Sequence, residues 1–317
     1  MQEGRVTRIE SKDIYVISND GSEIRCVLPG KIKNKYSLKK NKLNTLDIVA
    51  VGDFVKYSLK TSGNETVGII EEIAERKNYV SRKAPKIRGR GEKGKRLEQI
   101  VAANVDKLII VTSIANPPFN NRFVDRMLVI AESSEIEPLI IINKIDLDEN
   151  NTSNKWKSLY ESIGYKILEI SVKEKLNVDL LQSKIQEGKF VFWGQSGVGK
   201  SSLLNHLFPG LNLKTGEISD YSKKGKHTTV TAKLIQINSK ISVIDTPGIR
   251  EIEPYGISKN DLGHYFIEFL PFISDCKFNT CTHFHEPGCA VRTAVEQKKI
   301  HKERYQSYLN LLQSIEE

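Results

Sequence analysis

Residues 194–201 read Gly194-Gln195-Ser196-Gly197-Val198-Gly199-Lys200-Ser201, which fits the pattern G-x-x-x-x-G-K-[ST]. An apolar run at 190–193 precedes it, and a helical run begins at Ser202. A phosphate-binding loop needs this order of strand, turn and helix. Its glycines let backbone N–H groups converge on phosphate oxygens, and the helix N-terminus adds the positive end of its dipole. Lys200 is then expected to reach the β- and γ-phosphates, and the Ser201 hydroxyl to ligate magnesium. The alternative is an ordinary glycine-rich turn.

Three other segments complete the pattern of a nucleotide site. Asp245-Thr246-Pro247-Gly248 follows an apolar run, where a carboxylate suits a magnesium partner and the Gly248 N–H suits the γ-phosphate. Asn143-Lys144-Ile145-Asp146 also follows an apolar run, and an aspartate that accepts two N–H groups of a base would select guanine, since adenine has no donors there. The alternative is that residues 143–146 form only a polar turn after a strand. Ser171-Val172-Lys173 offers a backbone N–H to the guanine O6, but so short a signal carries little weight alone.

The rest of the chain falls into three parts. Residues 1 to about 74 show five short strand-like runs, with Asn19-Asp20-Gly21 as a hairpin signal. They predict a small barrel of the OB type, although SH3-like barrels give a similar pattern. Between about 98 and 254, strand-like runs alternate with helical ones and end in a hairpin pair at 234–237 and 241–244, which is typical of an α/β domain with a mainly parallel sheet. Beyond about 255 the chain turns helical.

The chain carries an excess of positive charge. It has 48 Lys and Arg against 39 Asp and Glu, a formal net charge of +9 and a pI near 9.1. Residues 31–42 contain six lysines and no acid, and residues 76–96 contain ten Lys or Arg and one acid, Glu92. Such runs favour a polyanionic partner. Because apolar residues do not recur at helical spacing in either run, we expect RNA or DNA rather than a membrane surface. The alternative is a solvated linker.

The sequence has four cysteines and no pattern that predicts export. Its apolar runs fall far short of the ~20 residues that span a bilayer, and the N-terminus lacks the apolar core of a signal peptide. We therefore expect a soluble cytoplasmic protein without a disulfide framework. Cys276, Cys281 and Cys289 lie within 14 residues together with His283 and His285, which indicates metal binding. Cys26 stands alone in a strand-like run and is predicted to be a buried small hydrophobe.

The nucleotide segments resemble the motifs of the translation-factor class of P-loop GTPases, but their order differs. In that class the phosphate loop comes first, whereas here residues 143–146 and 171–173 precede the loop at 194, which indicates a circular permutation. With an N-terminal barrel and a C-terminal Cys/His cluster, the chain resembles the ribosome small subunit-dependent GTPase A (RsgA) family over nearly its full length. The resemblance implies an α/β fold with a circularly permuted P-loop GTPase domain at 98–254. It also implies an OB-type RNA-binding barrel at 1–75, a basic linker at 76–97 and a helical zinc-binding domain at 255–317.

The resemblance implies catalytic and nucleotide-binding residues as well. Gly225-Lys226-His227-Thr228-Thr229 matches the switch I of that family, where Thr228 or Thr229 ligates magnesium in the GTP state and Thr229 is favoured. Ile249-Arg250 stands where a Ras-like enzyme has its water-orienting glutamine, so His227 is expected to position the water, because imidazole can orient or deprotonate water near neutral pH. A surface histidine without a role is the alternative. The expected catalytic set is His227, Lys200 and Thr229. GTP with Mg²⁺ is expected to contact Asn143, Lys144, Asp146, Ser171, Val172, Gly194, Gln195, Ser196, Gly197, Val198, Gly199, Lys200, Ser201, Ser202, Asp245 and Gly248, with Ser201 and Thr229 on the magnesium ion.

The spacing Cys276-x4-Cys281-x-His283-x5-Cys289 matches the zinc site of the same family. One structural zinc is therefore expected on these four residues, with His285 as the rival of His283. Three thiolates and one imidazole close a tetrahedral site, so we expect no catalysis from the zinc.

By the same resemblance, the chain is expected to be a GTPase that binds the small (30S) ribosomal subunit and its 16S rRNA. It would assist late maturation of that subunit, which would stimulate hydrolysis. We expect a cytoplasmic monomer with no membrane partner. Two other functions stay open: a GTP-gated RNA-binding scaffold that scarcely turns over, and a permuted GTPase that acts on the large subunit. The barrel and the zinc cluster argue against the second.

Overall fold

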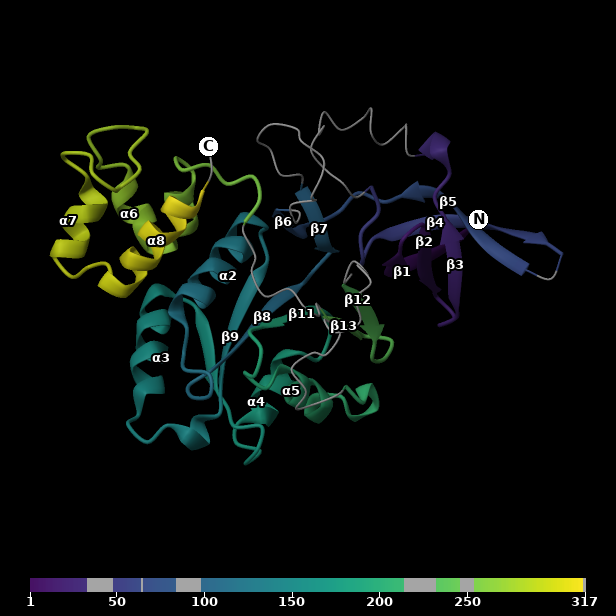
Figure 1. The fold of residues 1–317 in the computed structure, drawn as a ribbon, viewed down its shortest axis with the longest axis horizontal. Helices are drawn as coiled ribbons and strands as arrows, with labels where there is room; N and C mark the ends of the chain where they lie inside the picture. The colour runs from purple at the N-terminus through teal and green to yellow at the C-terminus, as the bar shows by residue number, and fades with distance from the viewer. Residues whose placement is uncertain (33–47, 64, 84–97, 214–231, 246–253, 316–317) are drawn as a thin grey trace, which may run out of the picture. The chain divides into compact units, whose positions relative to one another are not determined.

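The computed structural model describes residues 1–32, 48–63, 65–83, 98–213, 232–245 and 254–315 (Figure 1). The chain divides into two compact units, one of residues 1–107, 185–192 and 217–255, and the other of residues 108–184, 193–216 and 256–317. Among the described residues, no helix combines the length and the apolar character that a membrane crossing needs.

The N-terminal strands of the first unit close a five-stranded barrel in the order β1-β2-β3-β5-β4. They are β1 (Gln2–Glu10), β2 (Asp13–Ser18), β3 (Glu23–Val27), β4 (Phe54–Ser62) and β5 (Glu65–Ile73). Side chains alternate across each strand, so Val6, Val16, Tyr57 and Ile70 point inward and are fully buried in one apolar core. β3 pairs in parallel with β5, and the other barrel pairings are antiparallel. The prediction of an OB-type barrel is confirmed.

Cys26 lies in this barrel core, as predicted. It is fully buried next to Gly68, where a Cβ would lie only 2.3 Å from the Cys26 sulfur. Burial raises the pKa of the Cys26 thiol to about 11, so the thiol stays protonated and inert at neutral pH.

The segment after the barrel departs from the predicted basic linker wherever it is described. β6 (Tyr79–Lys83) pairs antiparallel with β7 (Glu98–Ala103). The Arg76 side chain, 7% exposed, forms a two-pronged ion pair with buried Asp53, at 2.7 Å for both Nε–Oδ1 and Nη2–Oδ2. Asn78 exchanges hydrogen bonds of 2.9 and 2.8 Å with the backbone of Val105. The charge count predicts a solvated linker, but these polar groups have buried partners, which a charge count cannot reveal. Residues 84–97 lie outside the described residues.

A six-stranded sheet carries the nucleotide motifs in the strand order β10-β9-β8-β11-β13-β12. Its strands are β8 (Lys107–Ser113), β9 (Glu137–Asn143), β10 (Lys166–Glu169), β11 (Gly188–Gly194), β12 (Lys233–Gln236) and β13 (Ile241–Asp245). β9 is parallel to β10 and β11 to β13, whereas β12 returns antiparallel to β13 as the predicted hairpin. The apolar runs 108–111, 139–142 and 190–193 are buried at every position, as strands covered on both faces require. The predicted α/β fold with a mainly parallel sheet is confirmed.

Helices join these strands: α2 (Asn121–Ser133), α3 (Thr152–Ile163), α4 (Val178–Lys184) and α5 (Lys200–Leu207), with short 3₁₀ turns η1 (Ile145–Leu147) and η2 (Pro209–Leu211). α2 begins after Asn120, whose side chain accepts a hydrogen bond of 3.1 Å from the Phe123 N–H. α3 ends at Gly164, which has a φ of 110° and so suits glycine.

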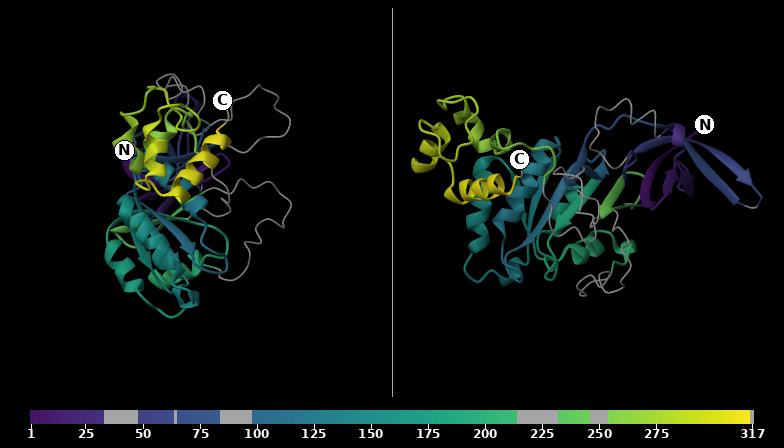
Figure 2. Two further views of the ribbon diagram at one scale, coloured as in Figure 1. Left: turned by 90° about the vertical axis from the view of Figure 1, so that its left-hand side faces the viewer. Right: turned by 45° about the horizontal axis from the view of Figure 1, so that its top comes forward.

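The C-terminal segment is helical, as expected, with η4 (Leu262–Tyr265), η5 (Ile267–Phe269), α6 (Leu270–Ile273), α7 (Ala290–Glu296) and α8 (Lys302–Ser314). α8 packs against α2 within the second unit (Figures 1 and 2). At this contact the Arg304 side chain, 1% exposed, pairs with Asp125 of α2 at 2.5 Å and with Glu268 of η5 at 2.6 Å. The Tyr160 hydroxyl donates to the same Asp125 oxygen at 2.7 Å. This buried network ties the C-terminal helices to α2, and no pattern in the sequence singled it out.

Candidate functional site

The phosphate loop connects β11 to α5 and needs glycine at its bends. A Cβ on Gly194 would lie 2.5 Å from the Val111 carbonyl oxygen, and a Cβ on Gly199 would lie 2.3 Å from Asn143 Nδ2. Gly199 also has a φ of 93°, in the left-handed region, and its carbonyl accepts the first helical hydrogen bond of α5, from Leu203 N–H at 2.9 Å. The structure therefore keeps the order of strand, turn and helix that the sequence predicted.

Asn143, at the end of β9, joins the phosphate loop to the turn at 171–172. Its side chain is 3% exposed. Nδ2 donates to the Val198 carbonyl at 2.9 Å, and Oδ1 accepts from the Val172 N–H at 3.2 Å. Both polar groups of this buried amide are satisfied within the protein. Three segments that lie far apart in the sequence therefore meet at one side chain.

Lys144 and Asp146 lie on the turn that follows β9. Lys144 has a φ of 64°, and its Nζ donates to the Gly197 carbonyl at 2.7 Å and to the Asn116 carbonyl. The buried Ser171 hydroxyl donates to Asp146 Oδ1 at 2.5 Å. An aspartate fixed in this way can accept the two N–H groups that guanine presents and adenine lacks. The lysine meanwhile holds the turn against the phosphate loop.

Four other predicted residues of this site lie on two elements. Lys200, Ser201 and Ser202 form the partly buried first turn of α5. Asp245 is the last residue of β13 and is the register partner of Phe192, two residues before the loop. Gly248, His227, Thr228 and Thr229 lie outside the described residues.

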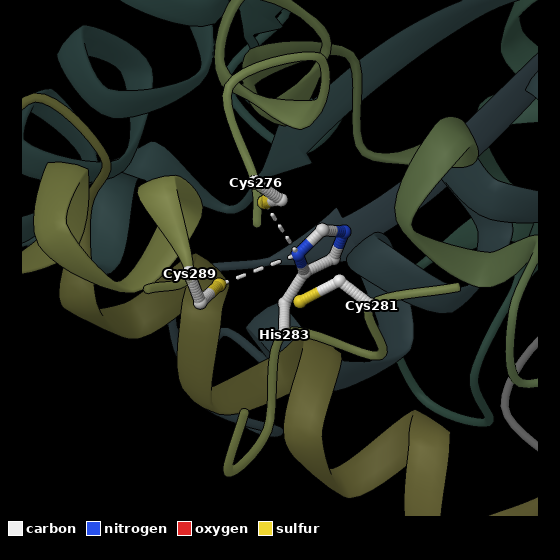
Figure 3. Close-up of side chains that lie close together, drawn as sticks. All are labelled: Cys276, Cys281, His283 and Cys289. Atoms are coloured by element: carbon white, nitrogen blue, oxygen red, sulfur yellow. Dashed lines mark hydrogen bonds between the residues drawn. The ribbon is translucent and has the colours of Figure 1, made fainter. Parts of the chain in front are cut away.

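A second candidate site lies in the C-terminal segment, where four predicted side chains converge (Figure 3). Cys276, Cys281, His283 and Cys289 place their ligand atoms within 4.8 Å of one another. Nδ1 of His283 lies 3.6 Å from the Cys276 sulfur and 3.4 Å from the Cys289 sulfur. Tetrahedral zinc, with Zn–S bonds of ~2.3 Å and Zn–N bonds of ~2.0 Å, sets ligand atoms roughly 3.5–3.8 Å apart, so this donor set fits the ion. His285 is exposed and outside the cluster.

Burial also makes the cluster suit a cation. It raises the pKa of the Cys281 thiol to about 12, raises the pKa of the Cys289 thiol, and lowers the pKa of the His283 imidazole. Thiols with such high pKa values lose their protons at neutral pH only when a cation stabilises the thiolates, and the neutral imidazole is the form that ligates a metal.

Hydrogen bonds hold the loop around the cluster. The Tyr305 hydroxyl donates to the His283 carbonyl at 2.7 Å, and the Tyr308 hydroxyl donates to the Thr282 carbonyl at 2.5 Å. The Glu286 carboxylate accepts from the Thr282 N–H at 2.8 Å and from its hydroxyl at 2.5 Å. Partial burial opposes ionisation of Glu286, but these hydrogen bonds prevail and lower its pKa to about 2. Sequence reasoning missed Glu286 and both tyrosines, because only folding brings them to the cluster.

The two basic runs are described only in part. Lys31 is exposed, and Arg82 of β6 donates from Nε to Gln99 at 3.0 Å. The lysines from Lys33 to Lys42, and Arg88, Arg90 and Arg96, lie outside the described residues. Their expected contacts with RNA stay predictions.

Sequence comparison finds relatives along nearly the whole chain. The sequence model of the RsgA GTPase matches residues 73–254. A protein of Chlorobaculum parvum named small ribosomal subunit biogenesis GTPase RsgA is 39% identical over 316 residues, which cover 99% of this chain and 98% of the relative. A protein of Bacteroides thetaiotaomicron named small ribosomal subunit biogenesis GTPase RsgA 2 is 38% identical over 305 residues, which cover 95% of this chain and 93% of the relative.

Solved structures share the fold. YjeQ from Thermotoga maritima superposes with a TM-score of 0.73 at 31% identity and covers 98% of this chain and 97% of its own. YloQ, described as a circularly permuted GTPase, superposes with a TM-score of 0.67 at 30% identity and covers 99% of this chain and 95% of its own. The predicted circular permutation is confirmed by this likeness.

Proposed function

The chain belongs to the RsgA GTPase family and is a GTP-hydrolysing enzyme, and on that premise we propose that it couples GTP hydrolysis to late maturation of the small ribosomal subunit. Two relatives that align along nearly the whole chain are named for biogenesis of that subunit. We propose further that the 30S subunit stimulates hydrolysis, because the chain has Ile249-Arg250 in place of a water-orienting glutamine and would turn over slowly alone.

The observation that carries the nucleotide proposal is the convergence at Asn143. One buried amide contacts Val198 of the phosphate loop at 2.9 Å and Val172 of the guanine-side turn at 3.2 Å. A ligand with a triphosphate at one end and guanine at the other spans this arrangement. The residues proposed to hold GTP are Asn143, Lys144, Asp146, Ser171, Val172, Gly194, Gln195, Ser196, Gly197, Val198, Gly199, Lys200, Ser201, Ser202, Asp245 and Gly248.

Within this site we assign each group one task. Lys200 binds the β- and γ-phosphates, and Ser201 and Thr229 ligate Mg²⁺, which supplies neutralisation of phosphate charge when bound. His227 positions the attacking water as the substitute for the missing glutamine. Asp146 selects guanine.

We assign one structural zinc to Cys276, Cys281, His283 and Cys289. Burial of the cluster, the short distances from His283 Nδ1 to two of the sulfurs and the exposure of His285 support this set. Four protein ligands leave no open position on the ion, so the zinc stabilises the C-terminal helices and takes no part in hydrolysis.

We propose that the basic runs at 31–42 and 82–96 bind phosphates of 16S rRNA and that the protein works as a cytoplasmic monomer. Its proposed domains are an RNA-binding barrel at 1–75, a GTPase domain at 98–254 and a zinc-binding domain at 255–317. We propose that residues 76–83, part of the expected linker, form a folded connection, which the Arg76–Asp53 ion pair and the pairing of β6 support.

The test of the nucleotide assignment compares GTP with ATP. A site that hydrogen-bonds the guanine N–H groups should reject ATP by roughly 10⁴ or more in affinity. Lys200→Ala and Ser201→Ala should each abolish turnover, through lost phosphate and magnesium contacts respectively. Equal affinity for ATP and GTP would remove the role of Asp146, and near-normal turnover in both variants would place the chemistry elsewhere.

A further inference from the structure

A cluster of cations lies within the first unit, where the barrel meets β11 and β13. Arg5 of β1 is the register partner of Phe54 in β4, and Lys189 of β11 is the register partner of Ser242 in β13. Arg5 Nη1 donates to the Ser242 hydroxyl at 3.2 Å. The guanidinium carbon of Arg5 lies 4.9 Å from the centroid of the Phe54 ring, and Lys189 Nζ lies 4.8 Å from the same centroid. We call these four side chains the junction cluster.

Among the described residues, the junction cluster has more cations than anions around it. Asp106 is the carboxylate whose charge acts on both Arg5 and Lys189. It also faces Lys77, whose Nζ lies 3.8 Å from Asp106 Oδ1, and its Oδ2 accepts the backbone N–H of Lys189 at 2.8 Å. Three cationic side chains thus share one carboxylate that already accepts a backbone hydrogen bond.

Burial makes this excess of charge unfavourable. Burial lowers the pKa of Arg5 and of Lys189, and the neighbouring charges of Arg5 and Lys77 lower the pKa of Lys189 further. Within the described part of the chain, the Nε of Arg5 is buried without a hydrogen-bond partner. Such a donor costs free energy until an acceptor reaches it. The Phe54 ring offsets part of this cost through cation–π contacts. Phe54 is nevertheless 40% exposed, and Arg5 and Lys189 are only partly buried, so solvent and ligands can reach the cluster.

We propose that the junction cluster binds a phosphate group of an RNA backbone, with Arg5 and Lys189 as its donors. A phosphodiester supplies the missing anion and acceptor oxygens for both cations, and guanidinium and ammonium groups are the usual partners of phosphate. The exposed Phe54 ring offers an apolar surface to the adjoining sugar or base. The cluster uses none of the residues assigned to GTP or zinc. This phosphate site depends on the proposed function in one respect only, namely that the bound RNA is ribosomal.

The test is binding of a short labelled single-stranded RNA, measured by fluorescence anisotropy over a series of KCl concentrations. On a single-stranded RNA, each phosphate contact contributes about −0.7 to the slope of log affinity against log salt. Lys189→Gln should therefore flatten the slope by that amount and weaken binding at low salt. Lys189→Arg, which keeps the charge, should bind nearly as the parent protein does. Lys184→Gln removes an exposed lysine of α4 and should change neither affinity nor slope.

Thermal unfolding of each variant controls for folding. If Lys189→Gln fails to fold, Arg5→Gln carries the same test, because it removes the other charge of the cluster, and a flatter salt slope is again expected. A slope unchanged in a folded Lys189→Gln variant would overturn the proposal and leave the cluster as a structural cation–π contact. Inorganic phosphate at matched ionic strength should not displace the RNA. Displacement would identify free phosphate as the ligand and overturn the assignment to RNA.

Co-sedimentation with 30S subunits separates this proposal from the proposed function. If the parent protein binds the short RNA through Lys189 but ignores 30S subunits, the ribosomal function is wrong and the phosphate site stands. If the parent protein binds 30S subunits and Lys189→Gln keeps the parent's salt slope on both ligands, the phosphate site is wrong and the ribosomal function stands.

Discussion

Replacing Asn143 by alanine should weaken GTP and GDP binding equally. The change removes the hydrogen bond to the Val198 carbonyl at 2.9 Å and the one from the Val172 N–H at 3.2 Å. A hydrogen bond contributes about 0.5–1.5 kcal/mol, and a buried group left without a partner costs about 1–3 kcal/mol. We therefore expect a loss of roughly 2–4 kcal/mol where the phosphate loop and the 171–172 turn meet.

Part of that loss should appear as affinity, because the loop contacts phosphates that GTP and GDP share. Binding ten- to a hundredfold weaker corresponds to about 1.4–2.8 kcal/mol. Titration with fluorescent GTP and GDP measures it, and urea unfolding measures the remainder. Asn143→Asp keeps the acceptor for Val172 but turns a carboxylate oxygen towards the Val198 carbonyl, so it should not restore the affinity lost in Asn143→Ala. Asp146→Ala is the contrasting variant, since it should lose the preference for guanine over adenine. Unchanged nucleotide affinity in Asn143→Ala, or loss of the guanine preference alone, would refute the positioning role of Asn143.

Three further predictions concern the C-terminal segment. Metal analysis should find one zinc per chain, and chelation should unfold this segment while GTP binding stays mostly intact. A Cys281→Ser variant that keeps its full zinc content and stability would contradict the site. Hydrogen bonds lower the pKa of Glu286 to about 2 in the folded chain, against an ordinary value of 4.5. The ionised carboxylate therefore stabilises the fold above pH 4.5, and this contribution is lost as the pH falls towards 2. In Glu286→Gln, the urea midpoint should therefore fall less below pH 4.5 than it does in the parent protein. An equal fall in both proteins would contradict the role of these hydrogen bonds. Arg304→Met leaves two buried carboxylates without their ion-pair partner and should lower the free energy of unfolding in urea by about 3–5 kcal/mol. The control Lys302→Met, on the exposed side of α8, should change it by less than about 0.5 kcal/mol. Similar losses in both variants would rule out the buried network.

Most of the fold and of the candidate site could be predicted from local sequence patterns. The phosphate loop and the Cys/His spacing each lie within a short run of sequence, so their chemistry is visible without long-range contacts. Continuous apolar runs predicted β8, β9 and β11, because parallel strands are buried on both faces. Alternation predicted the barrel strands. The spacing left His283 and His285 as rival ligands, and only burial in the folded chain separates them.

Long-range partners could not be predicted. Arg304 and Asp125 lie 179 residues apart, and a single charged residue on a helix gives no sign of a buried partner. The charges of Tyr79–Lys83 resemble those of a solvated linker, whereas the strand is defined by its pairing with β7. Asn143 is proposed to contact GTP, but no pattern in the sequence predicts that its amide also joins Val198 and Val172, which lie 55 and 29 residues away in the chain.

The GTPase rate measured against added ribosomal particles tests the proposed function most directly. Purified protein should hydrolyse GTP slowly alone, and the rate should rise and saturate as 30S subunits are added. Isolated 50S subunits should give no comparable increase. Tight GTP-dependent binding to 30S subunits without any rise in turnover would indicate an RNA-binding scaffold instead. Equal or greater stimulation by 50S subunits would contradict the assignment to the small subunit.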